Sequence, residues 1–349
     1  MVRYDCITSL LLSVVAFAIK DKWKLSWQIQ KLHSQHYTMW TCLLLYDLLY
    51  TEHEPLRQLQ NDTFVITFGR SGTQVMLNML HQIRTGGDNK FPDIMFQARH
   101  LVPIIKFGSG DLNDRQTGKF RIFFAHALPN QMLSPNRVIY VIRNPESVMR
   151  SWHNFAIQFF QAQDDPPDFR DFFYNCMLQH CTWPDQAYWN HIAEWWRLGR
   201  HEKSLPLLWL HYENIRNLQL HSEKPKRMKL VDSLCQFLNV TLTEEEMENV
   251  QDFTSYYFFA KNRRKFDVHS MSLNAAALIN FYIHNPDLML EERRSANRII
   301  SLDKSKNTID SIPPDVADVM ERMWQNIVTK ETNYGTYSHM LDDWSRNFS

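Results

Sequence analysis

The chain has 349 residues, of which 44% are hydrophobic, 22% charged and 13% aromatic. These fractions are typical of a globular protein, and the length allows one large α/β domain with its own core. Lysine plus arginine and aspartate plus glutamate both number 38, so the overall charge does not favour nucleic acid as a partner, and any anion-binding site must be local.

The five cysteines are scattered along the chain without a Cys-x-x-Cys pair, and no His-Glu-x-x-His pattern occurs. This spacing argues against a disulfide framework and against a zinc site, and it favours a reducing compartment. We therefore expect a cytoplasmic protein that needs no metal.

Residues 1–60 are predicted to form a helical segment ahead of the main domain. Within it, residues 6–19 carry no charge, and this stretch is short for a membrane span. It is typical of a buried helix or of the apolar part of a signal peptide. Two interpretations stay open: a packed or peripheral helix, or a segment that associates with a membrane or directs the chain to the Golgi lumen.

The next stretch predicts a strand, a short glycine turn and a helix. Thr63–Phe68 is β-branched, aromatic and nearly all apolar, as in a strand buried on both faces of a parallel sheet. Beyond the turn Gly69–Thr73, apolar residues recur at helical spacing until Gly86-Gly87, a plausible helix stop. The turn therefore places free N–H groups and the positive end of a helix dipole at one point, which suits a phosphate.

The turn adds the charge of Arg70 and the hydroxyl groups of Ser71 and Thr73 to these backbone donors. The standard P-loop pattern GxxxxGK[ST] is absent, because no lysine follows Gly72. We therefore predict a P-loop-like phosphate site rather than an ordinary ATP or GTP site.

The rest of the chain alternates strands with helices and contains no repeat, which predicts one α/β domain over residues 61–345 with a central parallel sheet flanked by helices. Residues 86–118 read as loop-rich and residues 160–180 as a polar and aromatic excursion over the sheet. The further predicted strands span 121–125, 137–142 and 207–212, and the further predicted helices begin at Pro145 and span 185–201, 228–238 and 244–253.

Each predicted strand ends in a polar group. The first strand ends at the Gly69–Thr73 turn, the second at His126, the third at Arg143 and the fourth at Tyr212-Glu213. Ligands of open parallel sheets bind outside the carboxyl ends of the strands. The pattern therefore predicts an anion site, a titratable imidazole and a second cation on one rim of the sheet.

The same segments carry a family resemblance. ITFGRSGTQV resembles the 5′-phosphosulfate loop TYPKSGTTW of the cytosolic sulfotransferases, and RVIYVIRNPESVMRSW resembles their 3′-phosphate segment. FFAHALPNQML is similar to KTHLPxxLLP, which holds the family's catalytic histidine. WNHIAEWWRLGR, LWLHYEN and DFTSYYFFAKN resemble three later motifs. Order and spacing hold from about Asp62 to Asn262, so the chain is identified as a divergent member of that family.

The resemblance implies that the chain uses PAPS (3′-phosphoadenosine 5′-phosphosulfate) to transfer a sulfuryl group to a small, largely apolar acceptor. His126 would be the general base, and Arg70 would replace the loop lysine that neutralises charge on the leaving phosphate. The implied cofactor contacts are Arg70, Ser71, Gly72, Thr73 and Gln74 at the 5′-phosphate, Arg143, Ser151 and Arg298 at the 3′-phosphate, and Tyr212, Thr254 and Tyr256 around the adenine.

The sequence also departs from the family pattern. Val75 stands where the family has the tryptophan that stacks on adenine, and Phe124 replaces a lysine two residues before the histidine. The glycine-rich RKGxxGDWKNxFT segment is not recognisable, so Arg298 competes with Arg293 and Arg294 for the 3′-phosphate, and a homodimer stays open. Two alternatives follow: an inactive sulfotransferase-like protein that binds a nucleotide or partner, and a lumenal glycan or tyrosine sulfotransferase.

Overall fold

The structure is a computed structural model. It describes residues 58–90, 99–100, 118–132, 135–159, 168–178, 188–218, 224–262 and 311–348. The predicted N-terminal helical segment lies outside these residues up to position 57, and Arg293, Arg294 and Arg298 also lie outside them.

A five-stranded parallel sheet forms the centre of the fold, with the order β2-β3-β1-β4-β5. The middle strand β1 (Thr63–Thr67) pairs in parallel with β3 (Ile122–Ala125) and with β4 (Val138–Ile142). The outer strands are β2 (Arg99–His100) and β5 (Leu207–His211). The predicted parallel α/β sheet is confirmed. The two-residue strand β2 was not predicted, because it is too short to have a periodic pattern.

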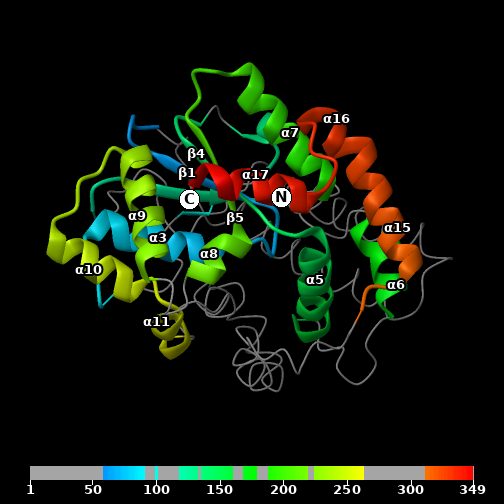
Figure 1. The fold of residues 1–349 in the computed structure, drawn as a ribbon, viewed down its shortest axis with the longest axis horizontal. Coiled ribbons are helices and arrows are strands. Elements are labelled where there is room, and N and C mark those ends of the chain that lie inside the picture. Colours follow the sequence, from blue (N-terminus) through cyan, green and yellow to red (C-terminus); the bar gives the residue numbers. More distant parts are fainter. Residues whose placement is uncertain are drawn as a thin grey trace, which may run out of the picture.

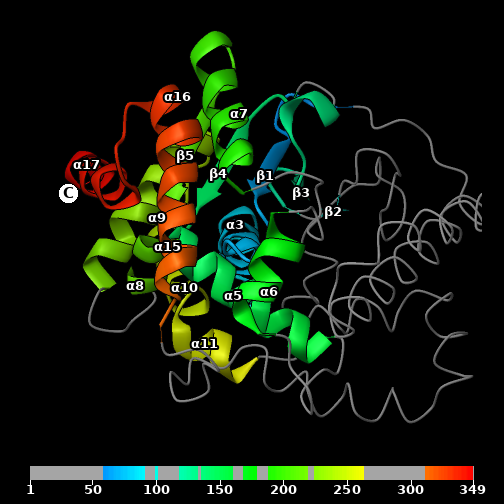
Figure 2. The same cartoon turned by 90° about the vertical axis from the view of Figure 1, so that its right-hand side faces the viewer.

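Helices cover both faces of the sheet, as Figures 1 and 2 show. On one side lie α3 (Thr73–Thr85), α8 (Tyr212–Leu218), α9 (Lys224–Leu238), α10 (Glu244–Phe253) and α11 (Tyr256–Lys261). The other side carries α5 (Pro145–Phe159), α6 (Phe169–Phe172), α7 (Tyr188–His201) and α15 (Pro314–Met323), which continues through a π-helical turn (Trp324–Thr329) into α16 (Lys330–Thr332). The last helix, α17 (Tyr337–Phe348), lies beside β5.

The alternation of side chains along β1 divides the interior into two cores. Phe64 and Ile66 belong to the core under α5, α6 and α7, whereas Val65 belongs to the core under α3, α9 and α10. All three side chains are buried. A strand covered on both faces must be apolar at every position, which explains why the sequence pattern around β1 is continuous rather than alternating.

The predicted ends of α3 and α10 are confirmed. Gly86 caps α3 in the left-handed region at φ 71° and donates its N–H to the carbonyl of Gln82. Thr243 caps α10 and exchanges two hydrogen bonds with Glu246 in a capping box. These caps follow the side-chain chemistry expected at helix ends.

The described part of the stretch 160–180 differs from the expected excursion over the sheet. Residues 169–177 are helical, and Phe169, Phe172 and Phe173 are buried in the core beside α7. Asp168 begins this helix by accepting a hydrogen bond from the N–H of Arg170. The aromatic residues of this segment belong to the core. Their helical spacing was not recognised in the sequence because polar residues stand between them.

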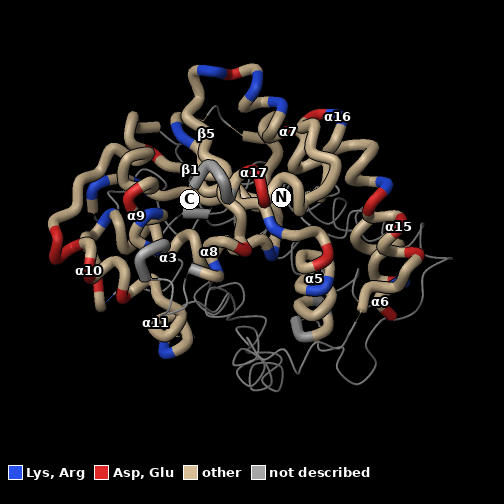
Figure 3. The backbone as a smooth tube through the Cα atoms, in the orientation of Figure 1, with Lys and Arg blue, Asp and Glu red and all other residues tan. Residues whose placement is uncertain are grey.

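No helix within the described ranges is long and apolar enough to cross a membrane. Figure 3 shows lysine, arginine, aspartate and glutamate interspersed over helices on both sides of the sheet. This distribution agrees with the equal numbers of acidic and basic residues in the chain.

Candidate active site at the carboxyl rim of the sheet

Four connections meet at the carboxyl rim of the sheet. The turn between β1 and α3 carries Arg70, and His126 directly follows β3. Arg143 lies between β4 and α5, and Tyr212 begins α8 directly after β5. Because all four strands are parallel neighbours, the topology itself brings these residues to one edge.

The turn before α3 combines left-handed backbone conformations with an uncapped helix N-terminus. Arg70 and Gly72 both have left-handed backbones, at φ 68° and φ 100°. A Cβ on Gly72 would lie 2.9 Å from Cε2 of Tyr212, so only glycine fits against that ring. The helix that follows has no side-chain cap and no acidic residue in its first turn. The positive end of its dipole is therefore uncompensated within the described residues.

Two buried donors at this turn have no partner within the described parts of the chain. Ser71 is fully buried and its Oγ makes no hydrogen bond to a described residue, and the buried Nε atom of the half-buried Arg143 also lacks such a partner. Buried polar atoms are nearly always paired in native proteins. The two orphaned donors therefore fit a ligand with acceptor oxygens.

Two guanidinium groups lie next to each other at the turn. Nη1 of Arg143 donates to the carbonyl of Arg70 at 2.6 Å, and its guanidinium lies 4.5 Å from the centre of the Tyr212 ring. Nε of Arg70 donates to Oγ of Ser151 at 3.2 Å, and its guanidinium lies 4.9 Å from the centre of the Phe155 ring.

Neither guanidinium forms an ion pair with a carboxylate that the structure describes. Burial, together with the charge of Arg143, lowers the pKa of Arg70 to about 10. Both causes disfavour a second positive charge at this point. A bound anion would offset both causes, so the chemistry of the pair is suited to an anion such as phosphate.

His126 is held by the end of β1. Its Nδ1 lies 2.8 Å from the carbonyl oxygen of Thr67 and 3.0 Å from Oγ1 of the same residue, which in turn lies 2.7 Å from Oγ1 of Thr73. A carbonyl only accepts, so we assign the proton to Nδ1 and the lone pair to Nε2. Burial lowers the pKa of His126, Arg70 lowers it further, and the Thr67 contact opposes them. The imidazole is therefore neutral and basic at Nε2 near pH 7.

The residues expected around an adenine lie on the α3 side of the turn. Thr254 is buried at the end of α10, and its hydroxyl donates to the carbonyl of Val250 at 2.7 Å. Tyr256 begins α11 and is half-buried. Asn78 joins this segment to α3 through a 2.9 Å hydrogen bond to the carbonyl of Phe253. The hydroxyl of Thr254 therefore donates within its own helix. Arg298, which was expected at the 3′-phosphate, lies outside the described residues.

The residues around the turn that depart from the family pattern are packed into the interior. Phe124 is 6% exposed, and its ring lies edge-on to His126 with centroids 6.4 Å apart. Val75 is half-buried against the core under α3, and Gln74 is half-buried in the first turn of that helix. Phe124 therefore brings an apolar wall, and no cation, to the histidine.

Sequence reasoning missed several supporting contacts. Trp152 donates its Nε1 to the carbonyl of Gly69 at 3.0 Å, and its ring leaves no room for a Cβ at Gly69. The hydroxyl of Tyr188 donates to the carbonyl of Arg143. Trp152 lies in a matched motif that could have indicated it, whereas the sequence gives no signal for Tyr188, which is 45 residues from its partner.

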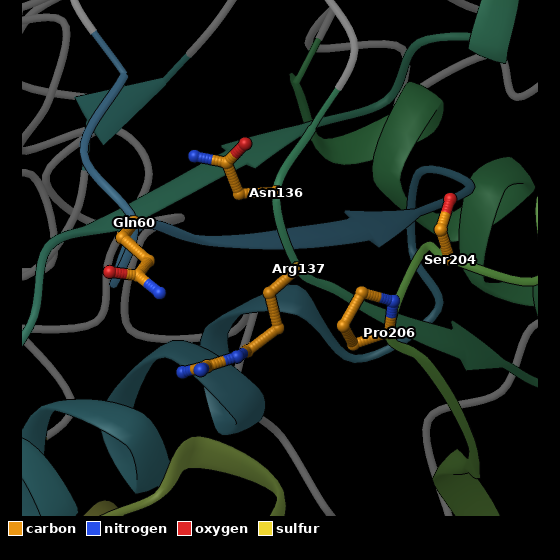
Figure 4. Close-up of a pocket in the computed structure, with 5 residues that line it drawn as sticks. All are labelled: Gln60, Asn136, Arg137, Ser204 and Pro206. Atoms are coloured by element: carbon orange, nitrogen blue, oxygen red, sulfur yellow. The ribbon is translucent and has the colours of Figure 1, made fainter.

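A cavity of about 490 Å³ lies at the opposite edge of the sheet, where β4 and β5 begin. Figure 4 shows the side chains around it, which are Gln60, Asn136, Arg137, Ser204 and Pro206. It takes no part in the rim. Within the described residues, no three His, Cys, Asp or Glu side chains are grouped to hold a metal ion.

Comparison with known proteins agrees with the motifs. Residues 60–276 match the sulfotransferase domain family. Sulfotransferase 1A1 of Mus musculus is 28% identical over 226 residues, which cover 60% of this chain and 72% of that protein. Sulfotransferase 1A1 of Rattus norvegicus is 30% identical over 213 residues, or 58% and 68% of the two chains. A crystal structure of mouse sulfotransferase SULT7A1 complexed with PAP is similar with a TM-score of 0.49 and 16% identity, over 87% of this chain and 93% of that one.

Proposed function

Because the chain belongs to the sulfotransferase domain family, we propose that it transfers a sulfuryl group from PAPS to a hydroxyl or amine of a small, largely apolar acceptor. The observation that carries this proposal is the convergence, at one rim, of a neutral histidine, two arginines that form no ion pair with a described carboxylate, and the donors of Ser71 and Arg143 that lack described partners. Anion donors beside a base are what this reaction needs.

The described residues fit a bisphosphorylated nucleotide. Ser71 and Arg143 offer buried donors that lack partners inside the described regions. We assign Ser71, Gly72, Thr73 and Gln74 to the 5′-phosphate, Arg143, Ser151 and Arg298 to the 3′-phosphate, and Tyr212, Thr254 and Tyr256 to the adenine. PAPS would supply the activated sulfuryl group, and the chain would supply orientation and charge.

His126 takes the proton of the acceptor hydroxyl at Nε2 in this proposal. The Thr67 carbonyl fixes the Nδ1–H tautomer and would stabilise the imidazolium that forms. Arg70 offsets negative charge that develops on the leaving phosphate. Its planar guanidinium donates to Ser151 rather than acting as the compact charge of a lysine.

A second candidate function is nucleotide binding without turnover. Buried Phe124 beside His126 favours it, because the cation that would stand there in the resembled family is missing. We further propose a domain boundary near residue 60. We also propose a cytoplasmic location, because the buried thiols of Cys176 and Cys235 are free, as is usual in a reducing compartment.

The test is calorimetric titration of adenosine 3′,5′-bisphosphate into the wild type and into Arg143→Ala and Arg70→Ala. Each variant should lose about 1.5–3 kcal/mol of binding free energy, as charge-assisted hydrogen bonds contribute. Arg137→Ala is the matched control, since this half-buried arginine lies at the opposite edge of the sheet and donates to the carbonyl of Leu238. A wild type that does not bind the bisphosphate would exclude the proposal.

Turnover separates the two candidate functions. Radiolabelled PAPS is offered with a panel of phenols, aliphatic alcohols and amines to the wild type and to His126→Asn. Labelled product from the wild type, with loss of turnover but unchanged bisphosphate affinity in His126→Asn, supports the transferase. Binding in both proteins without product from any acceptor supports the non-enzymatic alternative.

A further inference from the structure

The backbone of the turn between β4 and α5 is anchored by hydrogen bonds to side chains of other elements. The hydroxyl of Tyr188 donates to the carbonyl of Arg143, and the N–H of Asn144 donates to Oε1 of Glu213 at 2.9 Å. Glu213 directly follows Tyr212, whose ring lies under the Arg143 guanidinium. The Glu213 carboxylate therefore joins the backbone that carries Arg143 to the helix that carries its aromatic partner.

The second oxygen of Glu213 is bound by the C-terminal helix. The hydroxyl of Tyr337, the first residue of α17, donates to Oε2 of Glu213. Nδ1 of His211 lies 3.1 Å from the same hydroxyl, and burial lowers the pKa of this histidine to about 4. Since the tyrosine gives its one proton to the carboxylate, we assign Nδ1–H of the neutral His211 as a donor to the tyrosine oxygen.

The resulting chain of donors runs from His211 through Tyr337 to Glu213, and it leaves both carboxylate oxygens paired. Charge-assisted hydrogen bonds of this kind are stronger than neutral ones and fix the orientation of the carboxylate. Tyr337 itself has little freedom: it is 6% exposed, and its ring lies edge-on to Trp324 with centroids 6.0 Å apart.

The rest of α17 is fastened to the edge of the sheet. Nε1 of Trp344 donates to the carbonyl of Trp209 in β5 at 2.8 Å, and Met340 is buried in the core. Figure 1 shows the helix beside β5. Residues 337–348 lie beyond residue 276, where the family match ends. This support of the rim is thus a feature of the chain that the family match does not cover.

We propose that Tyr337 is a positioning residue for the nucleotide 3′-phosphate, which it acts on through Glu213 and Arg143. The inference rests on the proposed function, because it concerns the same nucleotide site. Without the tyrosine hydroxyl, Oε2 of the half-buried Glu213 loses its donor, and the carboxylate turns away to find another. The N–H of Asn144 then loses its acceptor, and Arg143 keeps one backbone anchor instead of two.

The variant Tyr337→Phe tests this mechanism, because it removes the hydroxyl and keeps the ring that fills the core. Tyr334→Phe is the matched control: its hydroxyl also donates to a carboxylate of the same segment, Oδ2 of Asp343 at 2.6 Å, without contact to Glu213. Calorimetry compares adenosine 3′,5′-bisphosphate with adenosine 5′-monophosphate in the wild type, both tyrosine variants, Arg143→Ala and the double variant Tyr337→Phe/Arg143→Ala.

We expect Tyr337→Phe to weaken bisphosphate binding about tenfold, as couplings within one hydrogen-bond network allow. Monophosphate binding should stay within about twofold of the wild type, since that nucleotide has no 3′-phosphate for Arg143 to hold. In the Arg143→Ala background the Tyr337→Phe effect should vanish, because the group through which it acts is gone. A general loss of packing would weaken both nucleotides in both backgrounds.

The inference is overturned if Tyr337→Phe binds the bisphosphate as tightly as Tyr334→Phe does, or if the two nucleotides lose affinity equally. It is also overturned if the loss persists in the Arg143→Ala background. Should Tyr337→Phe fail to fold, Glu213→Gln replaces it, and this variant must show the same selective loss of bisphosphate affinity. A wild type that binds neither nucleotide overturns the proposed function instead, so the two failures are distinguishable.

Discussion

Replacing Gly72 with alanine perturbs the rim at the point where the turn and Tyr212 meet. The backbone of Gly72 has φ 100°, a conformation that L-residues rarely adopt, and the added methyl group would lie 2.9 Å from Cε2 and 3.3 Å from Cγ of Tyr212. The collision cannot be relieved without a further loss, because the ring that must move also contacts the Arg143 guanidinium.

The expected loss divides into two parts. A left-handed backbone costs a non-glycine residue about 1–2 kcal/mol, and this part lowers the free energy of unfolding. Displacing the Tyr212 ring removes the contact with Arg143 at 4.5 Å, and a cation–π contact of a partly buried pair contributes about 0.5–2 kcal/mol. Since the second part concerns the proposed nucleotide site, we expect bisphosphate binding to weaken about twofold to thirtyfold.

Urea unfolding and calorimetric titration of adenosine 3′,5′-bisphosphate measure the two parts separately. Gly335→Ala is the control, because a Cβ at Gly335 would meet no atom within 4 Å and this glycine is not left-handed. That substitution should be neutral or stabilise the fold by about 0.4–1 kcal/mol. The double variant Gly72→Ala/Tyr212→Ala removes the collision and leaves the backbone strain. If Gly72→Ala matches Gly335→Ala in both assays, the account of the turn is wrong.

Two further predictions concern pH and a buried ion pair. Burial lowers the pKa of four histidines. The pKa of His81 and that of His211 fall to about 4, the pKa of His191 falls to about 3, and the pKa of His126 is also lowered. The unfolded chain therefore binds protons that the folded chain resists, so the free energy of unfolding should be constant in this respect above about pH 6.5 and fall below it. Urea midpoints at pH 7 and pH 5 measure this, with a smaller drop in His191→Gln, and a midpoint independent of pH would contradict it. Separately, the buried carboxylate of Asp62 pairs with Nε and Nη2 of Arg121 at 2.8 and 2.6 Å. Asp62→Asn should lower the free energy of unfolding by about 3–5 kcal/mol without changing nucleotide affinity. Asp315→Asn breaks an exposed pair with Arg170 and should leave the urea midpoint nearly unchanged. Equal effects of the two substitutions would refute the burial argument.

The sheet and its rim could be predicted because they depend on local patterns. Thr63–Thr67 forms a strand for reasons contained in its own residues, and the glycine turn that follows is likewise determined by its local sequence. Once parallel strands are predicted, the ends of the strands must share one edge. The position of His126 and Arg143 at this edge therefore follows from the strand topology and does not depend on contacts between them and the turn.

Contacts between distant segments could not be predicted in the same way. The helix at residues 169–177 was obscured because its buried aromatic residues stand among polar ones, and a short segment does not reveal which neighbours will cover it. Thr254 lay in a matched motif, yet its hydroxyl is bound to the carbonyl of Val250, so its expected place beside the adenine remains a prediction. Motifs identify segments, and the direction of each side chain depends on packing.

The bond between Tyr337 and Glu213 is the clearest case of such packing, since 124 residues separate the two. Glu213 alone read as one of several polar residues at strand ends, and Tyr337 followed the last recognisable motif. Only the crossing of α17 beside β5 makes one carboxylate accept from both the Asn144 N–H and the tyrosine. The proposed site residues are thus local in sequence, but the support that we propose for Arg143 comes from a helix that no site motif contains.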